Sequence, residues 1–256
     1  MSGKIRLIFL IVFIFLEFTL LVFPQDNLVK LELIFNKANI LYEEKKYSEA
    51  VKLYESILKK GYESGYLFYN LGNAYFKKGE LGKAILNYER ALKLIPLDSD
   101  LRTNYNYALS LIKVSVKGLE SFWFIRFLNK VFSPFTIDTL TILLSFIYFS
   151  LLGVLTLSFY LTFFRKYRRV IALSLIFLFF FSFSGLILKV SKQGKEAIVI
   201  VKEAQVKFAP LDEATLYFRV YEGQKLRIIS QEGTYYKIRD HRQKIGWIEK
   251  KALEVI

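Results

Sequence analysis

Two long uncharged segments constrain the fold of this 256-residue chain more than any other feature. Residues 139–164 and 170–188 contain no charged side chain, and only residues 165–169 separate them. At about 1.5 Å per helical residue, each segment is long enough to cross a hydrocarbon core of about 30 Å. The sequence therefore predicts two transmembrane helices joined by a short turn at 165–169.

Basic residues in the expected turn indicate how the helices are oriented. Four of its five residues are cations, and such clusters favour the cytoplasmic side of a membrane. These residues are Arg165, Lys166, Arg168 and Arg169. Three lysines beyond the second segment, at positions 189, 192 and 195, weaken the asymmetry.

Residues 1–25 are expected to form a signal peptide or a signal anchor. Lys4 and Arg6 precede an apolar run that ends at Phe23, which is the pattern of a secretory signal. Glu17 favours a cleaved signal, because a carboxylate in mid-bilayer costs roughly 2.5 kcal/mol or more. The residues around Phe23 lack a small-x-small cleavage pattern, so both alternatives stay open. A signal here places the regions before and after the two spans on the external side.

Composition narrows the possible chemistry. The chain has no cysteine and one histidine, which excludes disulfides, thiolate chemistry and multi-histidine metal sites. The net charge is +14, yet residues 24–120 carry 15 basic and 12 acidic residues. The strongest relative excess of cations lies beside the apolar segments, where cations meet anionic lipid. We therefore expect a lipid bilayer as a partner, and neither nucleic acid, a metal nor a cofactor.

An internal repeat with a period of 34 residues covers 31–98. Asn36 matches Asn70, and Asn39 matches Asn73. The second copy contains Leu71-Gly72-x-x-Tyr75, followed by Ala84, Tyr88, Ala91 and Pro96. This pattern resembles the tetratricopeptide repeat (TPR), a helix-turn-helix unit. We predict a TPR domain over 31–117, with repeats at 31–64 and 65–98 and a capping helix at 99–117.

The first helix of each repeat carries asparagine and aromatic side chains that are expected to share one face. Amides both donate and accept hydrogen bonds, so this face suits an extended or helical segment of a partner. The candidate residues are Phe35, Asn36, Asn39, Tyr42, Tyr66, Tyr69, Asn70, Asn73, Phe76 and Asn104. An alternative stays open, in which the asparagines stabilise packing between repeats.

Aromatic residues mixed with Arg126 and Lys130 indicate an interfacial segment over 121–135, before the first span. After the second span, 195–256 contains five short strand patterns separated by turns. They lie at 197–201, 205–208, 225–230, 235–239 and 245–248.

The C-terminal segments resemble the bacterial SH3 family, through Glu222-Gly223, Tyr235-Tyr236 and Gly246-Trp247-Ile248. The resemblance implies a small β-barrel that binds cell-wall peptides or proteins. Candidate recognition residues are Tyr217, Tyr235, Tyr236 and Trp247. In the alternative interpretation, Tyr236 and Trp247 belong to the barrel core.

The chain contains no phosphate-loop, zinc-protease or nucleophile-elbow motif, so we expect a protein that is not an enzyme. The expected fold class is a multidomain membrane protein with a helical TPR solenoid, a transmembrane hairpin and an SH3-like barrel. This order resembles BatE-like proteins of the bacterial aerotolerance operon. The resemblance implies an inner-membrane scaffold whose partners are von Willebrand factor A proteins and, indirectly, a MoxR-type AAA ATPase. A cell-wall sensor that binds peptidoglycan is the alternative.

Overall fold

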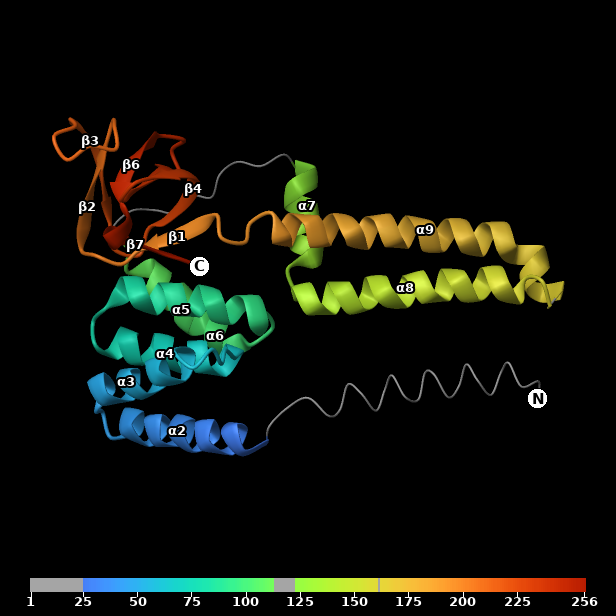
Figure 1. Cartoon of the computed structure of the whole chain (residues 1–256), viewed down its shortest axis with the longest axis horizontal. Helices are drawn as coiled ribbons and strands as arrows, with labels where there is room; N and C mark the ends of the chain where they lie inside the picture. Colours follow the sequence, from blue (N-terminus) through green and yellow to red (C-terminus); the bar gives the residue numbers. More distant parts are fainter. Residues whose placement is uncertain (1–24, 113–122, 161) are drawn as a thin grey trace. The chain divides into compact units, whose positions relative to one another are not determined.

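The computed structural model describes residues 25–112, 123–160 and 162–256 (Figure 1). The chain divides into two compact units, 1–62 and 63–256. The predicted signal lies outside the described residues up to position 24. Residues 113–117 of the predicted capping helix and residues 121 and 122 of the interfacial segment also lie outside them.

The described part of the first unit, residues 25–62, contains two helices, α2 (Gln25–Glu43) and α3 (Tyr47–Leu58), which pack against each other. The turn between them closes at Lys45, which has a φ of 62°. The Phe35 ring of α2 lies 5.8 Å from the Tyr54 ring of α3. The helix-turn-helix unit predicted for the first repeat is therefore present.

The second unit begins with α4 (Gly65–Lys77), α5 (Leu81–Leu94) and α6 (Ser99–Ser110). The Ser64 hydroxyl accepts a hydrogen bond from the Leu67 N–H at 3.1 Å and so caps α4. The Asp98 carboxylate caps α6 in the same way, through the Leu101 N–H at 2.8 Å. Pro96 follows the end of α5, where a helix cannot continue without losing a backbone hydrogen bond.

Two apolar helices, α8 (Ile137–Leu157) and α9 (Thr162–Val190), pack side by side (Figure 1). Both are long and apolar enough to cross a membrane, and only 22% and 11% of their most apolar windows are buried within the protein. A core helix of a soluble protein would be mostly buried.

The bounds of these two helices differ from the prediction. The first ends at Leu157 rather than 164, and the cations that were expected to form a turn lie inside α9. Arginine and lysine are good helix formers, and no glycine or proline interrupts the chain between Thr162 and Arg169. The connection instead lies between Leu157 and Thr162.

A short helix, α7 (Trp123–Phe132), precedes the two apolar helices and contacts α9. A Cβ atom on Gly185 would lie 2.6 Å from the Phe132 ring, so glycine is needed for this close approach. Leu128 and Phe132 are buried, whereas Trp123 and Phe127 are exposed. The helix therefore holds one face against α9 and presents aromatic side chains on another.

The C-terminal domain is an antiparallel seven-stranded sheet with strand order β3-β2-β6-β5-β4-β1-β7. The strand register shifts at Val206/Lys207 and at Ile228/Ser230, and interruptions of a ladder such as β-bulges bend a sheet. One cluster of buried side chains, contributed by all seven strands and by Ala252, fills the core. The strands are β1 (Glu196–Val199), β2 (Glu203–Lys207), β3 (Leu216–Tyr221), β4 (Lys225–Glu232), β5 (Tyr235–Arg239), β6 (Ile245–Glu249) and β7 (Leu253–Val255).

The sheet thus has two strands, β3 and β7, that the sequence patterns did not predict. In β3 the buried Phe218 and Val220 alternate with exposed residues, a period of two that is visible in the sequence. The predicted fold class is confirmed: a helical repeat region, two apolar helices and a small all-β domain.

Candidate functional site

A polar network joins the three helices α4, α5 and α6. The Asn73 Oδ1 atom accepts hydrogen bonds from the Tyr88 hydroxyl at 2.7 Å and from the Asn104 Nδ2 atom at 3.0 Å. Asn104 Nδ2 also lies 2.9 Å from the Tyr69 hydroxyl oxygen and donates to it. Three of the predicted partner-binding residues are therefore brought together, and their polar atoms bind one another.

The first unit repeats one of these bonds. The Tyr54 hydroxyl donates to the Asn39 Oδ1 atom at 2.6 Å, and both residues stand 34 positions before their counterparts Tyr88 and Asn73. The second asparagine of each repeat thus joins the two helices of its own repeat. Of the remaining predicted residues of α2, Asn36 is exposed, and the Tyr42 ring packs 5.4 Å from Tyr47.

Removal of the Tyr88 hydroxyl, by Tyr88→Phe, is expected to lower the free energy of unfolding by about 0.5–1.5 kcal/mol, the net contribution of one hydrogen bond. The half-buried Asn73 oxygen loses the bond from Tyr88 but keeps the one from Asn104. Thermal unfolding of the purified chain, followed by circular dichroism at 222 nm, measures the effect. Tyr62→Phe, in the connection between α3 and α4, is the control and should unfold like the parent.

An aromatic strip runs along the exposed side of α4 and α6. Tyr66 is 58% exposed, and the Phe76 ring packs 5.7 Å from the ring of Tyr107. Tyr107 is 59% exposed and was missed by the sequence prediction. Its position three residues after Asn104, on the same helix face, was the available signal. Tyr66, Tyr69, Asn70, Asn73 and Phe76 follow helical spacing on α4, so they share one face.

The C-terminal domain carries a stacked aromatic pair on its surface. The rings of Phe208 and Tyr217 lie 4.3 Å apart, and Phe208 is 60% exposed. A Cβ atom on Gly246 would lie 3.6 Å from the Tyr217 ring, so the Gly246-Trp247 dipeptide adjoins this pair. Trp247 is half-buried, with the Lys237 ammonium 5.5 Å from its ring. Phe208 was not among the predicted residues.

The two remaining predicted residues of this domain lie differently. Tyr235 is buried, and its hydroxyl donates to an Asp212 carboxylate oxygen. This hydrogen bond raises the pKa of Tyr235 to about 12. Tyr236 is half-buried, beneath the Lys250 ammonium at 5.2 Å. Tyr235 thus holds the loop between β2 and β3, whereas Tyr217 and Trp247 are available at the surface.

Charged residues occur at both ends of the apolar helices. Lys166, Arg168 and Arg169 are exposed near the start of α9, and the helix backbone also includes Arg165. At the other end, the Lys192 ammonium donates to the Asn129 side chain of α7 at 3.0 Å. Among the described residues, no group of three or more histidine, cysteine, aspartate or glutamate side chains could hold a metal ion.

Two family models match parts of the chain. Residues 65–96 match the tetratricopeptide repeat, and residues 189–254 match the GW (Gly-Tryp) dipeptide domain. The first match covers α4 and α5, and the second covers the sheet up to β7. Both are typically non-catalytic binding modules, for proteins or for peptidoglycan. No curated protein matches the chain.

Proposed function

We propose that the chain is a non-catalytic adaptor of the bacterial inner membrane. In this proposal α8 and α9 span the membrane, and the helical repeats and the GW-like domain bind envelope proteins on the periplasmic side. The order of modules supports a role in a Bat-type aerotolerance or envelope-stress complex. Its partners would be membrane-anchored von Willebrand factor A proteins and, through them, a MoxR-type AAA ATPase.

The observation that carries the proposal is the short, hydrogen-bonded connection between α9 and β1. Only five residues, 191–195, separate Val190 from Glu196. The Lys195 N–H donates to the Lys192 carbonyl at 3.2 Å, and the Lys195 carbonyl accepts from the Ile228 N–H of β4 at 2.7 Å. A binding domain is thereby fixed directly to the end of an apolar helix.

The helix α7 supports the same arrangement. Its exposed Trp123, Phe124 and Phe127 accompany Arg126 and Lys130, a mixture that suits the interface between lipid and water. The packing of Phe132 against Gly185 places this helix at the end of α9 that leads to the GW-like domain. We propose that α7 lies in the outer interface of the membrane.

The aromatic strip of α4 and α6 is the proposed partner-binding surface of the second unit. Tyr66→Ala combined with Tyr107→Ala should reduce recovery of membrane proteins in a pull-down from cross-linked membranes about tenfold or more. Exposed tyrosines at the centre of an interface contribute about 1–2 kcal/mol each. Lys77→Ala, at an exposed position of α4, serves as the control. Equal recovery by the double variant would contradict a role for this strip.

The proposed topology predicts the location of the C-terminus. A reporter that fluoresces only in the cytoplasm, fused after Ile256, should remain dark, whereas alkaline phosphatase at the same place should be active. The physical reason is that a signal and two spans return the chain to the external side. The reciprocal fusions within the connection between α8 and α9 provide the control. Fluorescence from the C-terminal fusion would reverse the proposed orientation.

The stacked Phe208 and Tyr217 favour a second candidate function, in which the GW-like domain binds peptidoglycan. Flat exposed rings provide contact area for sugars and peptide stems at little conformational cost. The detergent-solubilised chain should co-sediment with purified sacculi, and Phe208→Ala with Tyr217→Ala should abolish this. Absence of co-sedimentation by the parent chain would leave protein binding as the function of this domain.

A further inference from the structure

The second helix of the second repeat, α5, is buried on nearly all sides. Its residues Ala84 to Tyr88 are all buried, although a helix on a protein surface normally exposes one face. The contrast with the first repeat is clearest at one position. Leu86 is only 1% exposed, whereas Lys52, 34 residues earlier on α3, is exposed. The apolar face of α5 therefore needs another part of the protein to shield it from water, whereas the corresponding face of α3 is polar and does not.

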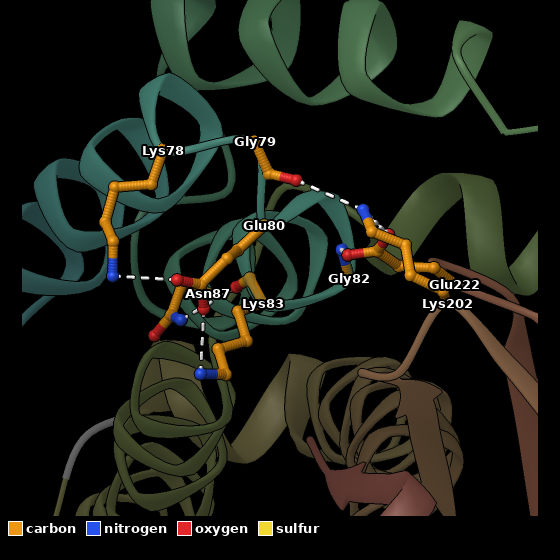
Figure 2. Close-up of polar contacts among 8 residues, drawn as sticks. All are labelled: Lys78, Gly79, Glu80, Gly82, Lys83, Asn87, Lys202 and Glu222. Carbon is orange, nitrogen blue, oxygen red and sulfur yellow. Dashed lines mark hydrogen bonds and ion pairs between the residues drawn. The ribbon is translucent and has the colours of Figure 1, made fainter.

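The GW-like domain binds the N-terminal end of α5 (Figure 2). The Glu222 carboxylate, in the turn after β3, accepts a hydrogen bond from the Gly82 N–H at 2.9 Å. Lys202 pairs with Glu222 and also donates to the Gly79 carbonyl at 3.3 Å. The N-terminal N–H groups of a helix have no partner within it, and a negative charge is favoured there.

The helix does not provide this cap itself. Glu80 is the residue at its N-cap position, and its side chain makes no capping hydrogen bond. Instead, its carboxylate pairs with Lys78 at 2.7 Å and Lys83 at 2.8 Å, as Figure 2 shows. Burial raises the pKa of Glu80, but these two lysines outweigh that effect and lower it overall. A carboxylate from the C-terminal domain thus replaces a cap that the repeat lacks.

Gly82 is required by the close approach of the GW-like domain to α5. A Cβ atom there would overlap the Val199 carbonyl oxygen and lie 3.0 Å from the Ile200 Cα atom. Glycine within a helix is about 1 kcal/mol less favourable than alanine. The backbone at the end of β1 leaves no room for any other residue. At the turn after β3, Gly223 has a φ of 82°, and a Cβ atom there would lie 2.8 Å from the Ile85 side chain.

A half-buried charge cluster joins the middle of α5 to the sheet. The Lys225 ammonium lies 3.1 Å from a Glu89 carboxylate oxygen of α5 and 2.8 Å from one of Glu196 in β1. Burial lowers the pKa of Lys225, but the two carboxylates outweigh burial and raise it. The Tyr105 hydroxyl of α6 donates to the same Glu89 carboxylate. Lys225 therefore keeps its charge, and the pair stays intact at neutral pH.

The C-terminal end of α5 meets the last strand. The Arg90 guanidinium donates to the Glu254 carboxylate at 3.0 Å and to the Val255 carbonyl at 2.8 Å. The Lys93 ammonium donates to the Ile256 carbonyl at 3.0 Å. The contacts therefore extend from the first turn of α5 to its last.

We propose that the GW-like domain is the permanent cap of the second repeat, and that this face of α5 is made for the chain's own sheet rather than for another protein. The two modules then move as one body. Because α5 covers one surface of the GW-like domain, ligands of that domain would bind the surface that carries Phe208 and Tyr217. This inference depends on neither the membrane orientation nor the identity of any ligand.

Two adjacent residues of α6 connect the GW-like domain to the aromatic strip. Asn104 binds Tyr69 and Asn73 on the α4 side, and Tyr105 binds Glu89 beside Lys225. Docking of the sheet therefore also fixes the helix that carries Tyr107. In the full chain, the order of the partner-binding strip depends on the GW-like domain.

Hydrogen–deuterium exchange of the full chain in nanodiscs tests the proposal. In the parent chain, amides of α5 should exchange at least tenfold more slowly than amides of α3. Gly82→Leu should raise α5 exchange at least tenfold and leave β5 protected, because the sheet domain detaches without unfolding. Ser48→Leu, at the equivalent exposed position of α3, is the matched control and should change nothing.

A second variant adds no heavy atoms to the chain. Glu89→Gln weakens the charge cluster, and it should raise exchange in α5 and α6 severalfold, whereas Glu55→Gln, at the same position of the first repeat, should not. If Gly82→Leu also raises exchange in β5, the sheet domain itself has unfolded. The comparison of Glu89→Gln with Glu55→Gln then tests whether the sheet domain protects α5. Unchanged α5 exchange in Glu89→Gln and Gly82→Leu, or equal exchange of α3 and α5 in the parent chain, would overturn the proposal.

Discussion

Gly72→Val is expected to destabilise the second repeat by about 2–3 kcal/mol, the cost of forcing extra atoms into a packed core. A Cβ atom at position 72 would lie 2.7 Å from the Tyr88 ring and 3.3 Å from the Ala84 carbonyl oxygen. The Tyr88 ring cannot swing aside, because it is buried and its hydroxyl is held by Asn73. The helices α4 and α5 must therefore separate.

Urea unfolding of the solubilised chain, followed by circular dichroism, measures this loss. Lys77→Val introduces the same side chain at an exposed position of the same helix and should shift stability by no more than about 0.5 kcal/mol. A Gly72→Val chain that unfolds at the parent's midpoint would contradict the close packing of α4 against α5.

Ile238→Ala should cost the GW-like domain about 3 kcal/mol. The Ile238 side chain is completely buried in the core cluster, and truncation of such a residue removes apolar contacts and leaves a cavity. Ile229→Ala, on the neighbouring strand β4, is the control, because that side chain is 44% exposed and should lose less than about 1 kcal/mol.

Tryptophan fluorescence isolates the response of this domain. The chain has two tryptophans, and Trp123→Phe leaves Trp247 of β6 as the single reporter. Unfolding of Ile238→Ala and Ile229→Ala in that background should then report the sheet alone. Equal midpoints for the two variants would contradict the assigned core.

The sequence allowed the modules to be predicted because their signals are local. The TPR-like pattern of the second repeat located Gly72, Tyr75, Ala84 and Tyr88 from the sequence alone, and all four are buried. Absence of charge likewise located the two apolar helices. The predicted ends of these helices were less accurate, because a cluster of cations favours one orientation in a membrane but does not end a helix.

The contacts between modules could not be predicted in the same way. Glu89 and Lys225 are 136 residues apart, and Arg90 and Glu254 are 164 apart. No pattern within a window of sequence pairs such residues. Two local departures were nevertheless visible: a glycine inside a helix at position 82, and Leu86 where the other repeat has Lys52. Both violate the expectation for a surface helix.

The candidate binding surfaces were predicted only in part. The asparagine series was found by its period, but the hydrogen bonds of Asn39 and Asn73 to tyrosines of their own repeats depend on side-chain geometry. Tyr107 and Phe208 were missed because each becomes part of an aromatic pair only when two elements pack. What these surfaces bind stays a prediction.

The five residues between α9 and β1 also limit how far the GW-like domain can lie from the end of α9. Even fully extended, they would span at most about 18 Å, and their hydrogen-bonded turns make the actual span shorter. If α9 spans a membrane, this short connection keeps the binding surfaces within a thin layer next to the lipid. A partner anchored in the same membrane would meet them at a high effective concentration, whereas a freely diffusing one would gain no such advantage.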